Sequence, residues 1–285
     1  MIRNIFGYSY RILVNAVSHY VRDNGNAFAS HVALSGLLSF FPFFIFGTSF
    51  ARFLGAFTYT PQKIKALVQL LPDAIAEPLS QEVINVSTIH RGGLLTISVI
   101  GAAYFASNGV EALRTALNKA YRVVDRRSLF FCRLQSLFFV IIGAIGLVVL
   151  SFSLIIVPLL IKIMRDHSSF IDEYIGVFRL WRYAIVFVVL FISLLIIHRW
   201  LPAGRRKIID ILPGIFVTMF LWFIASTAFA QYLAMFNYIS TYAGLASIMV
   251  AIIFLYMLSA IFILGGEINA AIMFYRNHHL QHLDE

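Results

Sequence analysis

The apolar positions of this chain gather into long runs separated by shorter polar stretches. A helix needs about 20 mostly apolar residues to cross the hydrocarbon core of a membrane. Runs of this length and character cover residues 32–53, 92–112, 134–161, 181–201, 211–236 and 244–269. The pattern therefore predicts an all-α integral membrane protein, a bundle of six transmembrane helices that forms a single membrane domain over residues 1–285.

Other stretches have apolar side chains on one side only, which predicts additional interfacial amphipathic helices. In residues 5–21 the apolar positions recur at helical spacing, and polar side chains occupy the rest of the wheel. We expect a cytoplasmic interfacial helix within residues 1–31, with residues 23–25 turning the chain into the first span. Two more amphipathic helices are expected in residues 58–91. They either plug the end of the bundle or form a lid over an outward cavity.

The composition agrees with this class. Hydrophobic residues make up 60% of the 285 positions, and charged residues make up only 12%. A soluble domain carries about 25% charged residues. So few charges cannot cover a water-facing surface.

The positions of Lys and Arg predict the orientation. The formal net charge is +9, and positive side chains concentrate in the cytoplasmic loops of membrane proteins. The N-terminus, the second-to-third and fourth-to-fifth connections and the C-terminal tail together carry about twice as many Lys and Arg as the other connections. We therefore expect both termini in the cytoplasm, with residues 270–285 as a cytoplasmic tail.

Glu267 is the most informative polar residue, because it lies near the end of the last apolar run in the stretch FILGGEINAA. An unpaired carboxylate in a poorly hydrated site is costly. The sixth span begins near Gly244, and about 20 residues at a rise of 1.5 Å place Glu267 near the cytoplasmic interface. Gly265 and Gly266 carry no side-chain bulk, which would let another helix approach closely.

The end of the second span offers partners for this carboxylate. Glu111 is expected at a similar depth, and Arg114 follows it by one helical turn on the same face. We predict that Arg114 pairs with Glu267, while Asn118 and Asn269 complete the hydrogen bonds. The alternatives are that headgroup water solvates Glu267, or that Glu267 acts as a proton-coupled gate.

Further polar residues inside the spans have two interpretations each. Asn108 and Gln231 either join helices by hydrogen bonds or belong to a polar track through the bundle. Pro42 removes a backbone hydrogen bond in the first span. It produces either a modest kink, with a neighbouring hydroxyl such as that of Ser39 satisfying the carbonyl, or a hinge or an exposed carbonyl in a cavity.

The basic loops favour lipid headgroups over nucleic acid as partners. Three adjacent cations, Arg205, Arg206 and Lys207, are expected to contact anionic headgroups at the cytoplasmic face. A metal-dependent nuclease needs clustered His and carboxylate ligands. The 13 acidic residues are scattered, and the one His cluster, HHLQH at residues 278–282, follows the last span. We expect no catalytic residue, metal or cofactor, and no bound nucleic acid.

Several segments in order resemble the YihY/BrkB family of bacterial inner-membrane proteins, which were once described as ribonuclease BN. The similar stretches are ASHVALSGLLSFFPFFIF, SNGVEALRTALNKAYRV, LPGIFVTMFLWFIAS and STYAGLASIMVAIIFLYMLSAIFILGGEINA. The resemblance implies a six-helix protein of the bacterial inner membrane whose biochemical activity is not settled, and it supplies no catalytic residue.

The functional hypothesis is transport or handling of a lipid or small solute at the inner membrane. It rests on the absence of any soluble domain, the polar residues inside several spans and the family context. The alternative is a structural or partner-binding protein of the envelope that transports nothing. The sequence leaves the substrate, the direction of transport, the coupling ion and homo-oligomerisation open.

Overall fold

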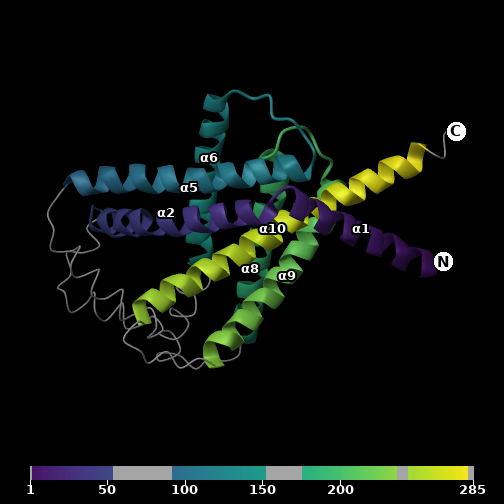
Figure 1. Ribbon diagram of the computed structural model, residues 1–285. Helices are drawn as coiled ribbons and strands as arrows, with labels where there is room; N and C mark the ends of the chain where they lie inside the picture. Colours follow the sequence, from purple (N-terminus) through teal and green to yellow (C-terminus); the bar gives the residue numbers. More distant parts are fainter. Residues whose placement is uncertain (1, 54–91, 152–174, 236–242, 282–285) are drawn as a thin grey trace. The chain divides into compact units, whose positions relative to one another are not determined.

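The computed structural model describes residues 2–53, 92–151, 175–235 and 243–281 (Figure 1). All regular structure in these residues is helical. The seven helices are α1 (Ile2–Arg22), α2 (Gly25–Phe53), α5 (Gly92–Ala120), α6 (Leu129–Ser151), α8 (Ile175–Trp200), α9 (Ile208–Met235) and α10 (Ala243–Gln281). Two compact units are present. Residues 1–34 and 109–285 form the first unit, and residues 35–108 form the second.

Four helices are long and apolar enough to cross a membrane. These candidate spans are Leu129–Leu147, Leu180–Trp200, Ile208–Leu233 and Ile248–Arg276. They coincide with the last four spans predicted from the sequence, and α2 and α5 are helical where the first two were predicted. An all-helical membrane protein is thereby supported, while the count of six spans stays a prediction. The amphipathic helices expected in residues 58–91 lie outside the described residues.

The N-terminal helix and the turn after it lie where the sequence predicted them, and the placement of this helix at the cytoplasmic interface stays a prediction. On α1, Ile12 and Ala16 are buried in one cluster with Ile268 and Ala271 of α10. Other large apolar side chains of α1 remain exposed, namely Tyr10, Leu13, Val14, Val17 and Val21. Asn24 adopts a left-handed backbone with φ 58°. A Cβ at Gly25 would collide with the Tyr20 ring, so a larger residue there would have to displace that ring.

In the second unit, α2 continues as a helix on both sides of Pro42. The Ser39 hydroxyl donates to the carbonyl of Gly36 at 2.7 Å. It therefore does not satisfy the Leu38 carbonyl that the proline leaves without its helical N–H, in contrast to our expectation. A Cβ at Gly101 of α5 would lie 3.5 Å from the Pro42 ring, an ordinary packing distance. Whether Pro42 is a hinge stays a prediction.

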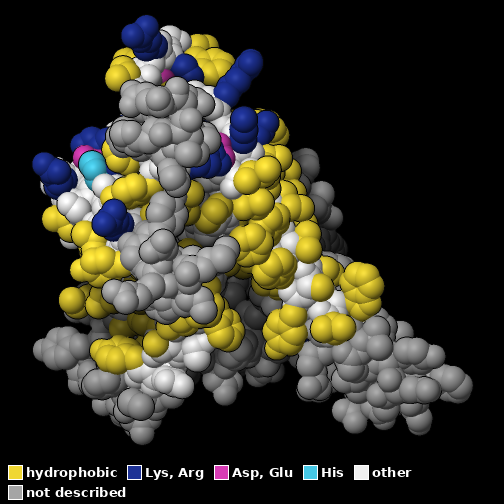
Figure 2. Space-filling model, turned by 90° about the vertical axis from the view of Figure 1, so that its right-hand side faces the viewer, with side chains coloured by type: hydrophobic (Ala, Val, Ile, Leu, Met, Phe, Trp, Pro, Cys, Tyr) yellow, Lys and Arg dark blue, Asp and Glu magenta, His cyan; other side chains and the backbone are white. Residues whose placement is uncertain are grey.

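The first unit is held together by the close approach of α9 and α10, which pack side by side (Figure 1). A Cβ at Gly265 would collide with Thr218 of α9, and one at Gly214 would collide with the backbone of Gly265. Gly266 faces another helix, because its Cβ would lie 2.7 Å from Leu117 of α5. The glycine pair of α10 thus admits two neighbouring helices, as the sequence predicted. Figure 2 shows Lys and Arg side chains in the upper half of the view, with hydrophobic side chains below and beside them.

Candidate functional site

The site is built where α5 ends, in the first unit. The N–H of Val123 donates to the carbonyl of Asn118 and that of Arg122 to Lys119, both at 2.9 Å. Arg122 has a φ of 55°. These two bonds and the left-handed residue form a Schellman motif, which usually has glycine at this position. The motif stops α5 and directs residues 121–128 back across its last turn.

Asp125 organises this returning loop. Its Oδ2 accepts hydrogen bonds from Arg114 Nη1 at 2.6 Å, from Asn118 Nδ2 at 3.0 Å and from Arg127 Nη2 at 2.8 Å. Its Oδ1 accepts two more from Arg127, from the backbone N–H at 3.1 Å and from Nε at 2.8 Å. The bonds from Arg127, followed by that from Arg114, hold the pKa of Asp125 well below its usual range although burial opposes them. Asp125 is therefore ionised at every physiological pH.

The same groups tie this loop to residues 201–207, which connect α8 to α9. The backbone N–H of Ala203 donates to Asn118 Oδ1 at 2.7 Å, and Arg127 Nη2 donates to the carbonyl of Leu201 at 3.1 Å. Gln135 of α6 accepts from Arg127 Nη1 at 2.7 Å and donates to the carbonyl of Trp200 at 2.6 Å. These hydrogen bonds join two loops that are distant in the sequence.

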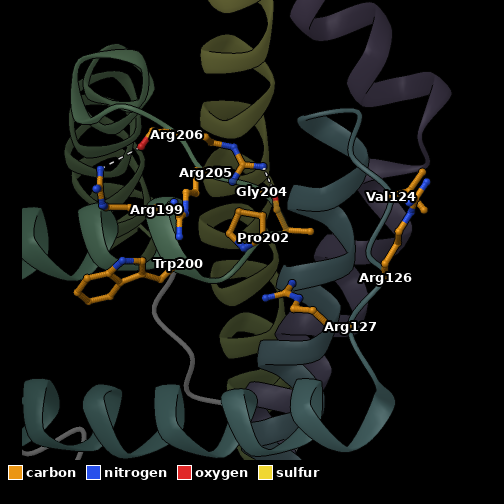
Figure 3. A pocket seen from close by; sticks show the side chains of 10 residues that line it. Val124, Arg126, Arg127, Arg199, Trp200, Pro202, Gly204, Arg205 and Arg206 are labelled. Atoms are coloured by element: carbon orange, nitrogen blue, oxygen red, sulfur yellow. Dashed lines mark hydrogen bonds between the residues drawn. The ribbon is translucent and has the colours of Figure 1, made fainter.

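Between the two loops lies a pocket of about 560 Å³ (Figure 3). Five arginines line it, together with Trp200, Pro202 and the loop backbone; they are Arg126, Arg127, Arg199, Arg205 and Arg206. None of the described residues that line the pocket is acidic. The Trp200 side chain is 57% exposed at the edge, and tryptophan is enriched at membrane–water interfaces. We call this cavity the arginine pocket.

The positive charge of the arginine pocket is mostly uncompensated. Within the ranges that the structure describes, Arg127 alone among the five pairs with a carboxylate, that of Asp125. Arg199 donates to the carbonyl of Arg206 at 3.0 Å, and Arg206 donates to the carbonyl of Ala203 at 2.7 Å (Figure 3). Carbonyl oxygens satisfy hydrogen bonds but supply no opposite charge. The structure records no ion pair for the exposed Arg126 and Arg205 within the described part of the chain.

Arg206 occupies the most constrained position in the pocket. Its residue is 8% exposed, and its guanidinium lies 3.9 Å from the centre of the Tyr121 ring. Its Nη1 is buried and has no hydrogen-bond partner among the described residues. Burial is the main cause of a lowered pKa for Arg206, and the charge of Arg127 adds to the lowering.

A chain of buried hydrogen bonds runs behind Arg206. Tyr121 Oη lies 3.0 Å from His198 Nδ1 and accepts from Asn269 Nδ2 at 3.3 Å. Asn269 Oδ1 accepts from the N–H of Gly214 at 2.6 Å. Burial raises the pKa of Tyr121 to about 12, so its hydroxyl keeps its proton and can donate it to His198. The ends of α5 and α8, the start of α9 and Asn269 within α10 are thereby joined.

An apolar groove lies on the α8–α9 hairpin, farther from the loop than the arginine pocket. Its volume is about 690 Å³. The lining side chains are Tyr183, Val186, Phe187, Leu190, Phe216, Met219, Phe220, Trp222, Phe223, Ser226 and Leu258. Exposed apolar residues of α8 and α9 surround it, which is typical of helices that face hydrocarbon. We call it the α8–α9 groove.

The predicted pairing of Glu267 with Arg114 is wrong. Arg114 pairs with Asp125 at 2.6 Å and more loosely with Glu111 at 3.6 Å. Glu267 is 2% exposed, so headgroup water does not solvate it either. Its Oε2 is buried without a hydrogen-bond partner in the described residues. The reason is that the loop after α5 folds back and brings Asp125 to Arg114, an arrangement that helix spacing does not reveal.

The other predicted site residues are dispersed. Asn118 and Asn269 make the buried bonds given above, but not to Glu267. Glu111 pairs with Arg133 at 2.9 Å. Asn108 is half-buried in the second unit, and Gln231 is exposed on α9. Two of the three predicted headgroup contacts, Arg205 and Arg206, line the arginine pocket, and Lys207 is exposed beside them.

Sequence reasoning missed several residues of this site. Asp125 is the one acidic residue in a strongly basic stretch, between Arg122 and Arg126. A single acidic residue among several basic ones indicates a carboxylate that pairs with neighbouring arginines. The buried pair of Tyr121 and His198 gave no comparable signal, because the two lie far apart in the sequence.

Comparison with known proteins gives two matches that cover most of the chain. The family model described as “Virulence factor BrkB” matches residues 16–284. The chain is 31% identical over 258 residues to “Putative ribonuclease-like protein YfkH” of Bacillus subtilis (strain 168), an alignment that covers 89% of this chain and 92% of that protein. No solved structure matches.

Proposed function

Because the chain belongs to the virulence factor BrkB family, we propose that it transports or otherwise handles a lipid or small solute at the bacterial inner membrane, with both termini in the cytoplasm. The observation that supports this proposal is the placement of a charged pocket and an apolar groove on the same helix hairpin. A lipid combines an anionic headgroup with apolar chains, and the two features match these two parts.

The spacing along α8 suits a single amphiphile. Leu190 lines the α8–α9 groove and Arg199 lines the arginine pocket. At a rise of 1.5 Å per residue they are separated by about 14 Å along the helix axis. This is shorter than an extended acyl chain, so one lipid can reach both. In this proposal Arg205, Arg206 and Lys207 contact anionic headgroups.

Lipid occupancy of the groove is the first prediction. Ser226→Trp should fill part of the α8–α9 groove and lower the lipid retained per protein after purification, as measured by quantitative mass spectrometry. It should also slow the movement of a fluorescent anionic lipid in proteoliposomes. Ser226→Ala is the matched control, because it removes the hydroxyl and leaves the groove open. Equal lipid content and equal rates for all three proteins would contradict the proposal.

The alternative is an envelope protein that binds a partner and transports nothing. The observation that favours it is the exposed apolar side of α1, which carries Leu13, Val14 and Val17 among others. An interfacial helix would cover the same side with lipid. Unchanged lipid movement together with a stable co-purifying protein partner would favour this alternative.

We further propose that this chain is not a ribonuclease, whatever the name of its Bacillus relative suggests. The described residues hold no group of three or more His, Cys, Asp or Glu side chains suited to a metal ion. Purified protein should leave single-stranded RNA intact in the presence of Mg²⁺, Mn²⁺ or Zn²⁺. Metal-dependent cleavage that disappears when one acidic residue is replaced would overturn this expectation.

A further inference from the structure

We infer that the arginine pocket binds a phosphomonoester group carried by an amphiphile, and that Arg126, Arg205 and Arg206 are its principal ligands. This inference rests on the proposed function and names the chemical class of its substrate. It goes beyond general attraction to anionic membranes, because it assigns a headgroup charge and a binding site.

The charge of the pocket is the first argument. Among the described residues, only Arg127 of the five lining arginines has a carboxylate partner, and the other four positive side chains have no opposite charge paired with them there. The positive charge of Arg127 acts on Arg206, and burial adds a desolvation cost for Arg206. A bound anion removes both penalties. Nη1 of Arg206 is buried and has no hydrogen-bond partner among the described residues, so an oxygen of a bound anion could accept its hydrogen bond.

The donor chemistry is the second argument. Guanidinium groups present a planar fork that matches phosphate oxygens two at a time. A phosphomonoester carries about −1.5 to −2 charges at pH 7 and three strong acceptor oxygens. A phosphodiester, as in most membrane lipids, has one negative charge and two free oxygens. Four uncompensated guanidinium groups therefore favour the monoester.

The surroundings of the pocket keep its own charge constant between pH 5 and 8. Asp125, bonded to Arg127, has a pKa held well below its usual range. Tyr121, under the Arg206 guanidinium, has a pKa raised to about 12. Guanidinium groups as a class keep their charge in this range, and His198 lies fully buried behind Tyr121. Any pH dependence of binding in this range should then come from the ligand, whose second ionisation has a pKa near 6.

The test measures binding of the full chain in detergent micelles to dioleoyl phosphatidic acid, a monoester, and to dioleoyl phosphatidylglycerol, a diester with the same acyl chains. Phosphatidic acid should bind about tenfold more tightly at pH 7.5. That preference should shrink at pH 5, where the monoester loses its second charge. The double variant R126Q/R205Q should abolish it, and folding should be unaffected because both side chains are exposed. K207Q is the matched control, since Lys207 is exposed next to the pocket but does not line it.

The outcomes separate this inference from the proposed function. K207Q should weaken both lipids equally and keep the preference. Equal affinity of the unmodified chain for the two lipids, or a preference that R126Q/R205Q retains, would overturn the phosphomonoester site while lipid handling through the groove survived. The same binding measurement with phenyl phosphate, a water-soluble phosphomonoester without acyl chains, tests whether the lipid chains contribute. If it bound as tightly as phosphatidic acid, the amphiphile part of the inference would be wrong and lipid handling would lose its support.

Discussion

Asp125→Asn is expected to lower the thermal stability of the protein strongly, by about 2–3 kcal/mol. The Asp125 side chain is 15% exposed and accepts five hydrogen bonds from N–H groups, four of them from arginines. Asparagine keeps the shape but offers one acceptor oxygen and no negative charge. Arg114, itself largely buried, would then lack its closest counter-charge. Thermal unfolding in detergent, followed by loss of the monodisperse peak in size-exclusion chromatography, measures the effect.

A double-mutant cycle tests whether the loss comes from the pairing itself. Arg114→Gln and Asp125→Asn should each destabilise, and the double variant should lose clearly less than the two losses added together. Glu111→Gln is the control, because its contact with Arg114 is longer, at 3.6 Å, and Glu111 is more exposed. Additive losses would show that Arg114 and Asp125 contribute independently.

The pH dependence of this contribution has a defined sign. The folded pKa of Asp125 lies below its unfolded value, so the ionised form is favoured in the folded state. The stabilisation is therefore fully present above the unfolded pKa of about 3.9 and is lost as the pH falls through the folded pKa. No change is expected between pH 5 and 8, which is why the pH dependence of lipid binding can be assigned to the ligand.

The sequence predicted the helices far better than the site. Long apolar runs have few alternatives to a membrane helix, so the last four spans and the amphipathic α1 could be located from pattern alone. The glycine pair 265–266 also indicated close packing, since two adjacent residues without side chains let another helix approach.

The partners of the charged residues could not be predicted in the same way. Arg114 and Glu267 were matched by depth and helical face, but depth does not show which side chain a folded loop brings closer. The turn at Arg122 decides the outcome, because its left-handed backbone sends the chain back over α5 and carries Asp125 to Arg114. A left-handed arginine has no sequence signal comparable to glycine. The arginine pocket depends on the same turn, so it was equally hidden.

Gly265→Ala is expected to lower the stability of the protein strongly, because this glycine lies where α9 and α10 approach closely. The new Cβ would collide with Thr218 Oγ1 and would lie 3.0 Å from the carbonyl oxygen of Gly214. The first contact involves a short side chain and the second a backbone atom, so neither can give way without moving α9. Overpacking usually costs about 1–3 kcal/mol. Separation of two helices along their contact should cost more, and we expect a loss of at least about 3 kcal/mol or failure to assemble a monodisperse protein.

Two further variants distinguish this steric effect from a general intolerance of alanine. Gly143→Ala adds the same methyl to α6, where nothing lies within 4 Å of the new Cβ. It should leave thermal stability unchanged or slightly higher, because alanine is the better helix former. Gly265→Ala combined with Thr218→Ala should recover part of the loss, since the hydroxyl is removed while the Gly214 carbonyl stays. If Gly265→Ala were as stable as Gly143→Ala, α9 and α10 would not be in contact at this glycine. The bond from the Gly214 N–H to Asn269, which depends on the same close approach, would then also be in doubt.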